Sequence, residues 1–242
     1  MSHVGDPARL EARVARKSVR TASGQSVEVI ADLSFALDDG ETGALIGPSG
    51  CGKSTLMRIL AGLDRNFEGT VRIPAHGRIG MAFQEPRLLP WRSLEDNVRL
   101  AAPEASETEI AALFAALRLS DHRTHYPGEL SLGLARRTAL ARAFAVRPTL
   151  LLLDEPFVSL DAPLARQMQR DLARLVESHR MTTVLVTHDV EEAIRLADRI
   201  FVLSARPAHV IGDILVAHPR GAMIEEEERA ISARVEALLR AG

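Results

Sequence analysis

Residues 47–55 have the sequence Gly-Pro-Ser-Gly-Cys-Gly-Lys-Ser-Thr, which matches the pattern G-x-x-x-x-G-K-[ST]. The glycines of this pattern let the backbone turn sharply and bring N–H groups close to phosphate oxygens. Lys53 supplies a mobile positive charge for the outer phosphates of a nucleotide, and the hydroxyl of Ser54 can ligate Mg²⁺. We therefore predict a phosphate-binding loop. The residues expected to contact the nucleotide are Gly47, Pro48, Ser49, Gly50, Cys51, Gly52, Lys53, Ser54 and Thr55.

The sequence on either side of the loop supports this prediction. The apolar Ala-Leu-Ile segment at 44–46 is typical of a short strand, and residues 55–61 have the composition of a helix. A helix that starts directly after the loop would direct its positive end at the phosphates. A Gly-rich turn with no ligand is the weaker interpretation in this context, so we expect a nucleotide-binding protein.

Two further apolar segments end in residues that can act on a nucleotide. Residues 150–153 are four leucines followed by Asp154 and Glu155, which indicates a buried strand that ends in two carboxylates. Asp154 suits the Mg²⁺ shell, and Glu155 suits a carboxylate that polarises an attacking water. The Val-Leu-Val segment at 184–186 leads to His188, for which we favour a γ-phosphate contact over a purely structural role.

Composition limits the classes of function. The chain has 242 residues, 46% hydrophobic content and a net charge of −2, so it can bury a full core and lacks the basic excess of a nucleic-acid-binding protein. Cys51 is the only cysteine, which excludes a disulfide within the chain and favours a reducing compartment. No run of 18 apolar residues occurs, so any membrane span would come from another chain.

The pattern of apolar residues changes along the chain. Residues 10–84 indicate mostly short strands around the phosphate loop, with turns at 22–24, 38–40 and 76–77. Residues 85–147 have helical periodicity, residues 148–220 alternate strands with helices, and residues 221–242 form an acidic, then amphipathic, terminal helix. Short apolar strands that alternate with helices predict an α/β fold whose mostly parallel sheet is covered on both faces.

Several helices can be placed from local signals. Ser106 and Glu109 form an S-x-x-E capping box ahead of an apolar stripe. Helices are also expected at 163–177 and 191–197. The apolar positions expected in the core are Ile110, Leu113, Phe114, Leu117, Leu164, Met168, Leu172, Leu175, Ile231, Val235 and Leu238.

Together these motifs resemble those of the ATPase subunits of ABC transporters, over nearly the whole chain. Gln84 in Met-Ala-Phe-Gln-Glu-Pro matches the Q-loop of that family. Ser159-Leu160-Asp161 matches the D-loop, and Thr187-His188-Asp189 matches the H-loop. Residues 83–91 and 203–207 are further similar to the nitrate/sulfonate/taurine-type import subgroup.

The resemblance implies a P-loop NTPase core with an N-terminal antiparallel β-subdomain and an inserted α-helical subdomain, as one ABC ATPase domain. It implies ATP and Mg²⁺ as ligands, held between two cassettes that close head-to-tail. The signature segment would be residues 130–134, with Ser131 and Gly133 at the γ-phosphate of the opposite nucleotide and Asp161 nearby. The implied catalytic residues are Glu155, His188 and Gln84, and the implied metal ligands are Ser54, Gln84 and Asp154.

The implied partners are a second copy of the subunit, transmembrane permease subunits and a solute-binding protein. The implied location is the cytoplasmic face of the inner membrane, where the subunit would energise import of small anionic solutes. The segment 87–91 would lie near the permease docking surface. Trp91, the only tryptophan, can alternatively pack the helical lobe, and the sequence favours neither interpretation.

Three positions in two segments depart from the family pattern. The family signature is Leu-Ser-Gly-Gly-Gln, whereas this chain has Leu132 and Leu134 in place of the first glycine and the glutamine. Val19 stands where the family usually has an aromatic residue that stacks on adenine. These departures leave one alternative function, a catalytically weak regulatory cassette paired with a competent ATPase. A GTP-binding switch is less compatible because the chain has no Asn-Lys-x-Asp motif.

Overall fold

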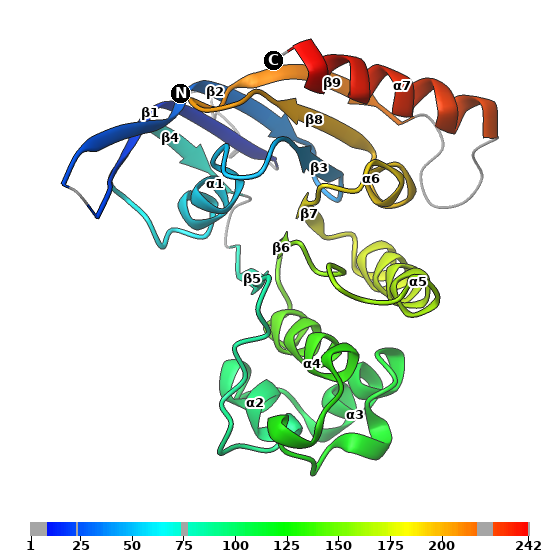
Figure 1. The fold of residues 1–242 in the computed structure, drawn as a ribbon. Coiled ribbons are helices and arrows are strands. Elements are labelled where there is room, and N and C mark those ends of the chain that lie inside the picture. The colour runs from blue at the N-terminus through cyan, green and yellow to red at the C-terminus, as the bar shows by residue number, and fades with distance from the viewer. Residues whose placement is uncertain (1–8, 23, 74–76, 217–224, 242) are drawn as a thin grey trace, which may run out of the picture. The chain divides into compact units, whose positions relative to one another are not determined.

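The computed structural model describes residues 9–22, 24–73, 77–216 and 225–241 (Figure 1). The chain divides into two compact units, one formed by Met1–His76 with Thr182–Gly242 and the other by Gly77–Met181. None of the helices within the described ranges is both long enough and apolar enough to cross a membrane. The predicted turns at 22–24 and 76–77 include Ser23 and His76, which lie outside the described residues.

The first unit contains an antiparallel sheet built from its N-terminal part. In spatial order its strands are β2 (Ser26–Leu37), β1 (Leu10–Arg20) and β4 (Glu68–Arg72). Leu10, Ala12 and Val14 are buried whereas Arg13 is exposed, which is the alternation expected of a sheet with one face on the core. This sheet is the antiparallel β-subdomain that the family resemblance implies.

The second set of strands in this unit carries the phosphate loop. In spatial order it consists of β7 (Thr182–Val186), β3 (Thr42–Ile46), β8 (Arg199–Leu203) and β9 (Val210–Leu215). The strands β7 and β8 run parallel to β3, and β9 is antiparallel to β8. Every residue of β3 and β7 is buried, as expected for parallel strands covered on both faces. Because β3 and β7 are parallel neighbours, the segments that follow them emerge at the same edge.

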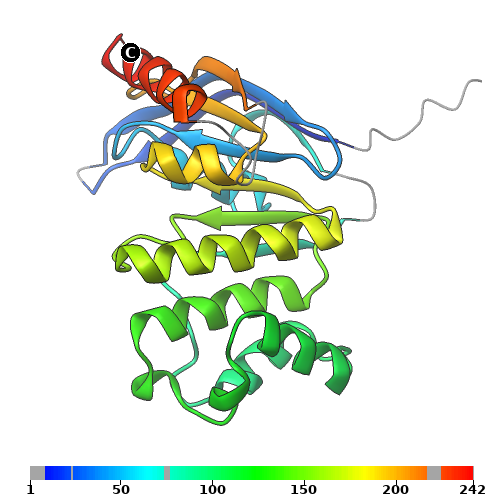
Figure 2. The same ribbon diagram turned by 90° about the vertical axis from the view of Figure 1, so that its right-hand side faces the viewer.

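The described residues of this unit form the helices α1 (Lys53–Leu60), α6 (Val190–Leu196) and α7 (Glu225–Ala241). Figures 1 and 2 show α7 running alongside β9. Val235 of α7 is fully buried in a cluster with Ile194 and Ile214, and Ile231 and Leu238 pack against that cluster. Burying one such side chain contributes roughly 1.5–3 kcal/mol, so the predicted apolar face of the terminal helix explains its attachment.

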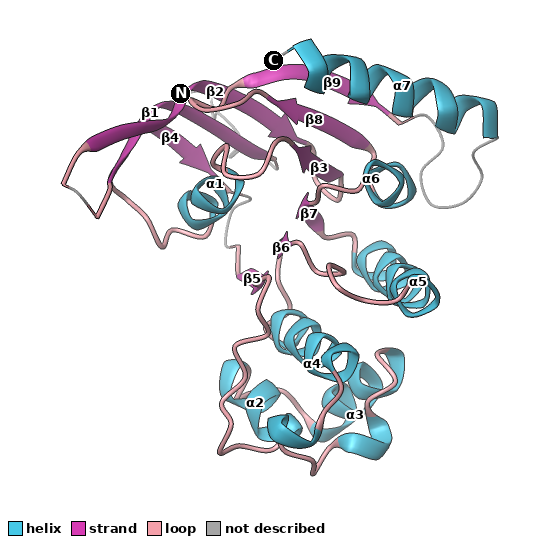
Figure 3. Ribbon diagram, viewed as in Figure 1, coloured by secondary structure: helices cyan, strands magenta, loops and turns pink. Residues whose placement is uncertain are grey.

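The second unit combines a pair of parallel strands with a helical lobe (Figure 3). Its strands are β5 (Ile79–Ala82) and β6 (Leu150–Asp154). Its α-helices are α2 (Leu94–Ala101), α3 (Glu107–Ala116), α4 (Leu132–Ala145) and α5 (Ala162–His179), with short 3₁₀ turns at Ser120–His122 and Pro127–Glu129. Ile110, Phe114 and Leu117 are buried, in agreement with the predicted stripe.

Local capping explains where several of these helices begin. The capping box is confirmed, because Ser106 accepts from the Glu109 N–H and the Glu109 side chain accepts from the Ser106 N–H. The helix expected at 191–197 begins one residue earlier, since the Asp189 side chain caps it by accepting from the Glu191 and Glu192 amides. The helix expected at 163–177 is extended at both ends, to Ala162–His179.

Candidate active site

The predicted phosphate loop connects the end of β3 to the start of α1. Gly50 and Gly52 have φ angles of 73° and 134°, in the left-handed region that favours glycine. Gly52 is the residue directly before α1, so the first amides of that helix belong to the loop. The loop therefore has the conformation and the helix N-terminus that an anion-binding turn requires.

Lys53 closes this loop through its own side chain. The side chain is buried, with 7% exposure, and Nζ donates to the carbonyl oxygens of Gly47 at 2.7 Å and Pro48 at 2.9 Å. These carbonyls satisfy a buried ammonium group that would otherwise be costly to desolvate. The positive charge is thus held within the loop. Cys51 is also buried, which favours a packing role over a reactive one.

Neighbouring strands leave no space for side chains at two of the loop glycines. A Cβ atom added at Gly52 would lie 2.8 Å from Cγ1 of Val29 in β2, and one added at Gly47 would lie 3.0 Å from Cβ of Leu203 in β8. Both distances are shorter than ordinary van der Waals contact, so larger residues would displace the loop. Residues of β2 and of the end of β8 therefore pack closely against the loop.

His188 emerges from β7 at the same edge as the loop, because β3 and β7 are parallel neighbours. The side chain of His188 is exposed. Thr187, which is buried, accepts from the Asp189 N–H at 3.0 Å, and Asp189 in turn caps α6. The backbone on each side of His188 is therefore held in place, as a residue that contacts a ligand requires.

In the second unit, the two predicted carboxylates lie at the end of β6. Asp154 is buried and Glu155 is half-buried. Glu155 has a φ of 46°, an uncommon conformation for a residue with a side chain and one that concentrates at functional sites. Gln84, which follows β5, donates from Nε2 to Oε2 of Glu155 at 3.4 Å. The parallel pairing of β5 with β6 thus brings Gln84 and the second carboxylate together.

The predicted signature segment forms the start of α4. Ser131 caps the helix, since its Oγ accepts from the Leu134 N–H, and its side chain is exposed. Gly133 is buried, and a Cβ atom there would lie 2.6 Å from Cδ2 of Leu164. Leu132 is 44% exposed at the first turn of the helix. Asp161 is exposed at the residue before α5.

Two arginines that the sequence reasoning did not single out support this part of the site. Arg136 is buried in α4 and donates to the carbonyl oxygen of Pro156 at 3.0 Å, directly after Glu155. Arg142, also in α4, donates to the carbonyls of Pro86 and Arg87, both at 2.8 Å. Burial lowers the pKa of both guanidinium groups. Both arginines fall within residues 85–147, where the sequence predicts helices, and nothing in the sequence there distinguishes a buried arginine from a solvated one.

The segment after Gln84 carries an exposed aromatic residue. Trp91 is 71% exposed, which argues against the interpretation that it packs the helical lobe. The guanidinium carbon of Arg87 lies 4.3 Å from the centre of the Phe83 ring, a cation–π contact. With the hydrogen bonds from Arg142, this contact orders the segment and leaves the Trp91 ring available at the surface.

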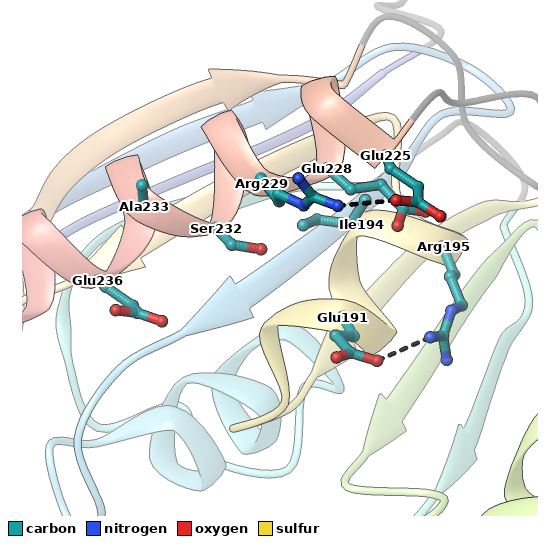
Figure 4. Close-up of a pocket in the computed structure, with 9 residues that line it drawn as sticks. All are labelled: Glu191, Ile194, Arg195, Glu225, Glu228, Arg229, Ser232, Ala233 and Glu236. Carbon is teal, nitrogen blue, oxygen red and sulfur yellow. Dashed lines mark hydrogen bonds and ion pairs between the residues drawn. The ribbon is translucent and has the colours of Figure 1, made fainter.

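A hollow of about 460 Å³ lies away from these residues, between α6 and α7 (Figure 4). Its lining is rich in glutamates, and its two arginines are paired within their own helices. Arg195 contacts Glu191 of α6, and Arg229 contacts Glu225 of α7, both at 2.7 Å. The predicted site residues do not line this hollow.

The chain is similar to known proteins over most of its length. A family model described as "ABC transporter" matches residues 30–158. The aliphatic sulfonates import ATP-binding protein SsuB 2 of Pseudomonas syringae pv. tomato is 42% identical over 189 residues, which cover 78% of this chain and 81% of the relative. The SsuB protein of Bacillus licheniformis is 41% identical over 212 residues, covering 83% of this chain and 82% of the relative.

Solved structures give a matching result. A dimeric bacterial ABC transporter cassette superimposes with a TM-score of 0.76, and a dimeric ATP-binding cassette in a post-hydrolysis state with ADP and phosphate superimposes with a TM-score of 0.74. Each is 26% identical and covers 86% of this chain and 99% of the solved one. These similarities confirm the predicted fold class, an α/β P-loop core with an antiparallel β-subdomain and a helical subdomain.

Proposed function

We propose, from the premise that this chain belongs to the ABC transporter family, that it hydrolyses Mg·ATP to energise an importer of small anionic solutes, aliphatic sulfonates among them. The observation that carries the proposal is the hydrogen bond between Gln84 and Glu155 at the end of β6. It pairs an acidic group with an amide that can report whether a γ-phosphate is present. The relatives named as sulfonate importers supply the substrate class.

The proposed roles follow from the chemistry of each side chain. Lys53 and the amides of the 47–55 loop would bind the β- and γ-phosphates. Glu155 would accept a proton from the attacking water, and His188 would donate a hydrogen bond to the γ-phosphate. The strained backbone of Glu155 supports this role, because such strain persists only where the surroundings hold the residue in place.

The oxygen groups available fit a magnesium ion. Mg²⁺ prefers oxygen ligands and is usually held by one or two protein groups together with substrate phosphates. Ser54, Gln84 and Asp154 would supply these oxygens from the chain. When bound, the ion neutralises charge on the phosphate oxygens.

We expect two copies of the chain to act together. The solved cassettes that resemble it are dimeric. In this arrangement Ser131 and the Gly133 N–H would meet the nucleotide of the opposite copy, with Asp161 beside them. The exposed start of α4 supports this role, because a helix N-terminus with a capping serine can receive phosphate oxygens.

Permease subunits would supply the membrane-spanning part, and a solute-binding protein would deliver the solute. The exposed ring of Trp91 supports docking of a permease on the 87–91 segment. Gln84 lies a few residues before this segment, so a change at the nucleotide would be passed to the docking surface. The subunit would then lie on the cytoplasmic face of the inner membrane.

ATP turnover by the assembled transporter tests these roles. We expect Glu155→Gln to lower turnover by at least a hundredfold while Mg·ATP still binds, because the base is lost and the phosphate contacts remain. The exposed Glu104 in the same unit provides a matched control, Glu104→Gln, which should be silent. Turnover that is unaffected by Glu155→Gln would favour the regulatory cassette. Stimulation of turnover by a sulfonate-loaded binding protein, but not by an uncharged solute, tests the substrate class.

A further inference from the structure

The turn between β8 and β9 is internally fixed by hydrogen bonds. Ser204 is 3% exposed, and its Oγ lies 2.8 Å from the carbonyl oxygen of Ala205 and 3.2 Å from that of Pro207. The His209 N–H donates to the same Oγ at 3.1 Å, and the Ser204 N–H donates to the His209 carbonyl at 3.0 Å. A buried hydroxyl with several partners rigidifies the chain around it. Arg206 lies at the tip of this turn.

The turn is also attached to the strand that flanks the phosphate loop. The Ala208 N–H donates to the Val29 carbonyl at 2.8 Å, and the Ala31 N–H donates to the Ala208 carbonyl at 3.1 Å. Val29 is also the residue whose Cγ1 would lie 2.8 Å from a Cβ atom added at Gly52. One backbone frame, formed by β2 and the β8–β9 turn, therefore both packs against the loop and positions Arg206.

Arg206 reaches from this frame to the loop itself. Its Nη2 donates to the carbonyl oxygen of Gly50, a residue 156 positions earlier in the chain. The Cys51 N–H, on the other side of the same peptide group, donates to the Pro48 carbonyl at 3.3 Å. Both polar atoms of the Gly50–Cys51 peptide are thereby held, and its orientation sets the direction of the amides that follow.

We propose that Arg206 is a positioning residue for the nucleotide phosphates. It holds the Gly50–Cys51 peptide in the orientation that presents the following amides to phosphate oxygens before nucleotide arrives. It also adds a second cation at the rim of a loop that already contains Lys53. The inference rests on the proposed binding of ATP by this loop.

The structural reason to expect an effect is pre-organisation. A glycine-rich loop is flexible, and ordering it on binding costs conformational free energy. A guanidinium donor that fixes one peptide beforehand reduces that cost, and hydrogen bonds to charged groups are stronger than neutral ones. An exposed arginine that merely rests on the surface would contribute little. If Arg206 orders the loop, removing it should weaken phosphate binding. If Arg206 only rests on the surface, removing it should leave phosphate binding unchanged.

Three variants of the full-length protein separate them: Arg206→Ala, Arg206→Lys and the control Arg240→Ala, an exposed arginine on α7. Mg·ATP affinity is measured by titration calorimetry, and kcat and KM are measured in the assembled transporter. We expect Arg206→Ala to raise the Kd for Mg·ATP roughly tenfold and to raise KM with little change in kcat, because the hydrolytic groups are untouched. Arg206→Lys should fall between Arg206→Ala and the wild type.

A second measurement excludes a merely structural role. Hydrogen exchange of the peptide that covers residues 47–55 should be faster in nucleotide-free Arg206→Ala than in the wild type, while the Tm without nucleotide stays the same. A Kd within twofold of wild type, an equal loss in Arg240→Ala, or a lowered Tm that accounts for the weaker binding would each overturn the proposal. Absence of Mg·ATP binding by the wild type would instead overturn the proposed function.

Discussion

Arg136 in α4 donates from Nη1 to the carbonyl oxygen of Pro156 at 3.0 Å, and so ties the helix that begins at the signature segment to the chain directly after Glu155. The same nitrogen lies 3.4 Å from the carbonyl oxygen of Glu155. The guanidinium is buried, and these hydrogen bonds to backbone carbonyls fix the position of the carboxylate-bearing residue.

This relationship predicts that Arg136→Met lowers both stability and turnover. Removing the donor leaves a buried carbonyl without its partner, which costs about 1–3 kcal/mol. It also releases the backbone of Glu155, so kcat should fall at least tenfold while Mg·ATP affinity changes little. Urea unfolding and steady-state turnover measure the two effects. Arg166→Met, at an exposed position of α5, is the control. An unchanged kcat in a destabilised Arg136→Met would show that the contact serves stability alone.

Much of this fold could be predicted from the sequence because the signals are local. The capping box of Ser106 and Glu109 lies within one helical turn, and the buried strands Thr42–Ile46 and Leu150–Asp154 contain the apolar runs at 44–46 and 150–153. Gly50 and Gly52 of the phosphate loop have positive φ angles, which agrees with the sharp turn that the motif predicts. In each case the residue types restrict the backbone without help from distant parts of the chain.

The contacts made by Arg136 and Arg206 could not be predicted in this way. Each arginine donates to a backbone carbonyl, and every residue carries one, so no partner type marks the contact in the sequence. Arg206 and Gly50, which are hydrogen-bond partners, are 156 positions apart, and only the pairing of the strands between them brings them together. The positive φ of Glu155 is likewise invisible, because glutamate has no preference for that conformation.

The helical lobe should lose stability in acid through Glu95. Hydrogen bonds from Arg123, followed by those from Arg99, outweigh burial and lower the pKa of Glu95 below its usual 4.5. The folded-state pKa is depressed, so the stabilisation is present above pH 4.5 and is lost as the pH falls through the folded value. Free energies of unfolding between pH 6 and pH 3 should therefore fall more steeply in the wild type than in Glu95→Gln. Parallel pH profiles of the two proteins would contradict this account.

Val19→Tyr should tighten ATP binding at least severalfold. Val19 is half-buried near the end of β1 and pairs with Val27, and it stands where the family usually has an aromatic residue. A tyrosine adds a π face on which adenine can stack. Titration with ATP measures the effect. Arg20→Tyr, one residue further along the strand and therefore on the other face, is the control. Equal affinities for wild type and Val19→Tyr would show that adenine does not lie over this position.

Restoring the family signature should strengthen ATP-dependent pairing of two copies. Leu132 is 44% exposed at the start of α4, where backbone amides would approach a phosphate of the opposite copy, and its side chain adds bulk there. Leu134 lacks the polar group of a glutamine. In a Glu155→Gln background, which blocks turnover, we expect Leu132→Gly with Leu134→Gln to lower the protein concentration needed for a Mg·ATP-dependent dimer, as followed by light scattering.

The control for this experiment is Leu100→Gln, an exposed leucine on α2. If the protein carrying only Glu155→Gln already dimerises fully and the restored signature changes nothing, the two leucines are tolerated and two identical sites suffice. If neither protein pairs although both bind Mg·ATP, the second half of the site comes from a different cassette or requires the permease. Dimer formation needs the signature segment, whereas Mg·ATP binding needs the phosphate loop. Measuring dimer formation and Mg·ATP affinity therefore distinguishes an effect of Leu132 and Leu134 on pairing from an effect on the phosphate loop.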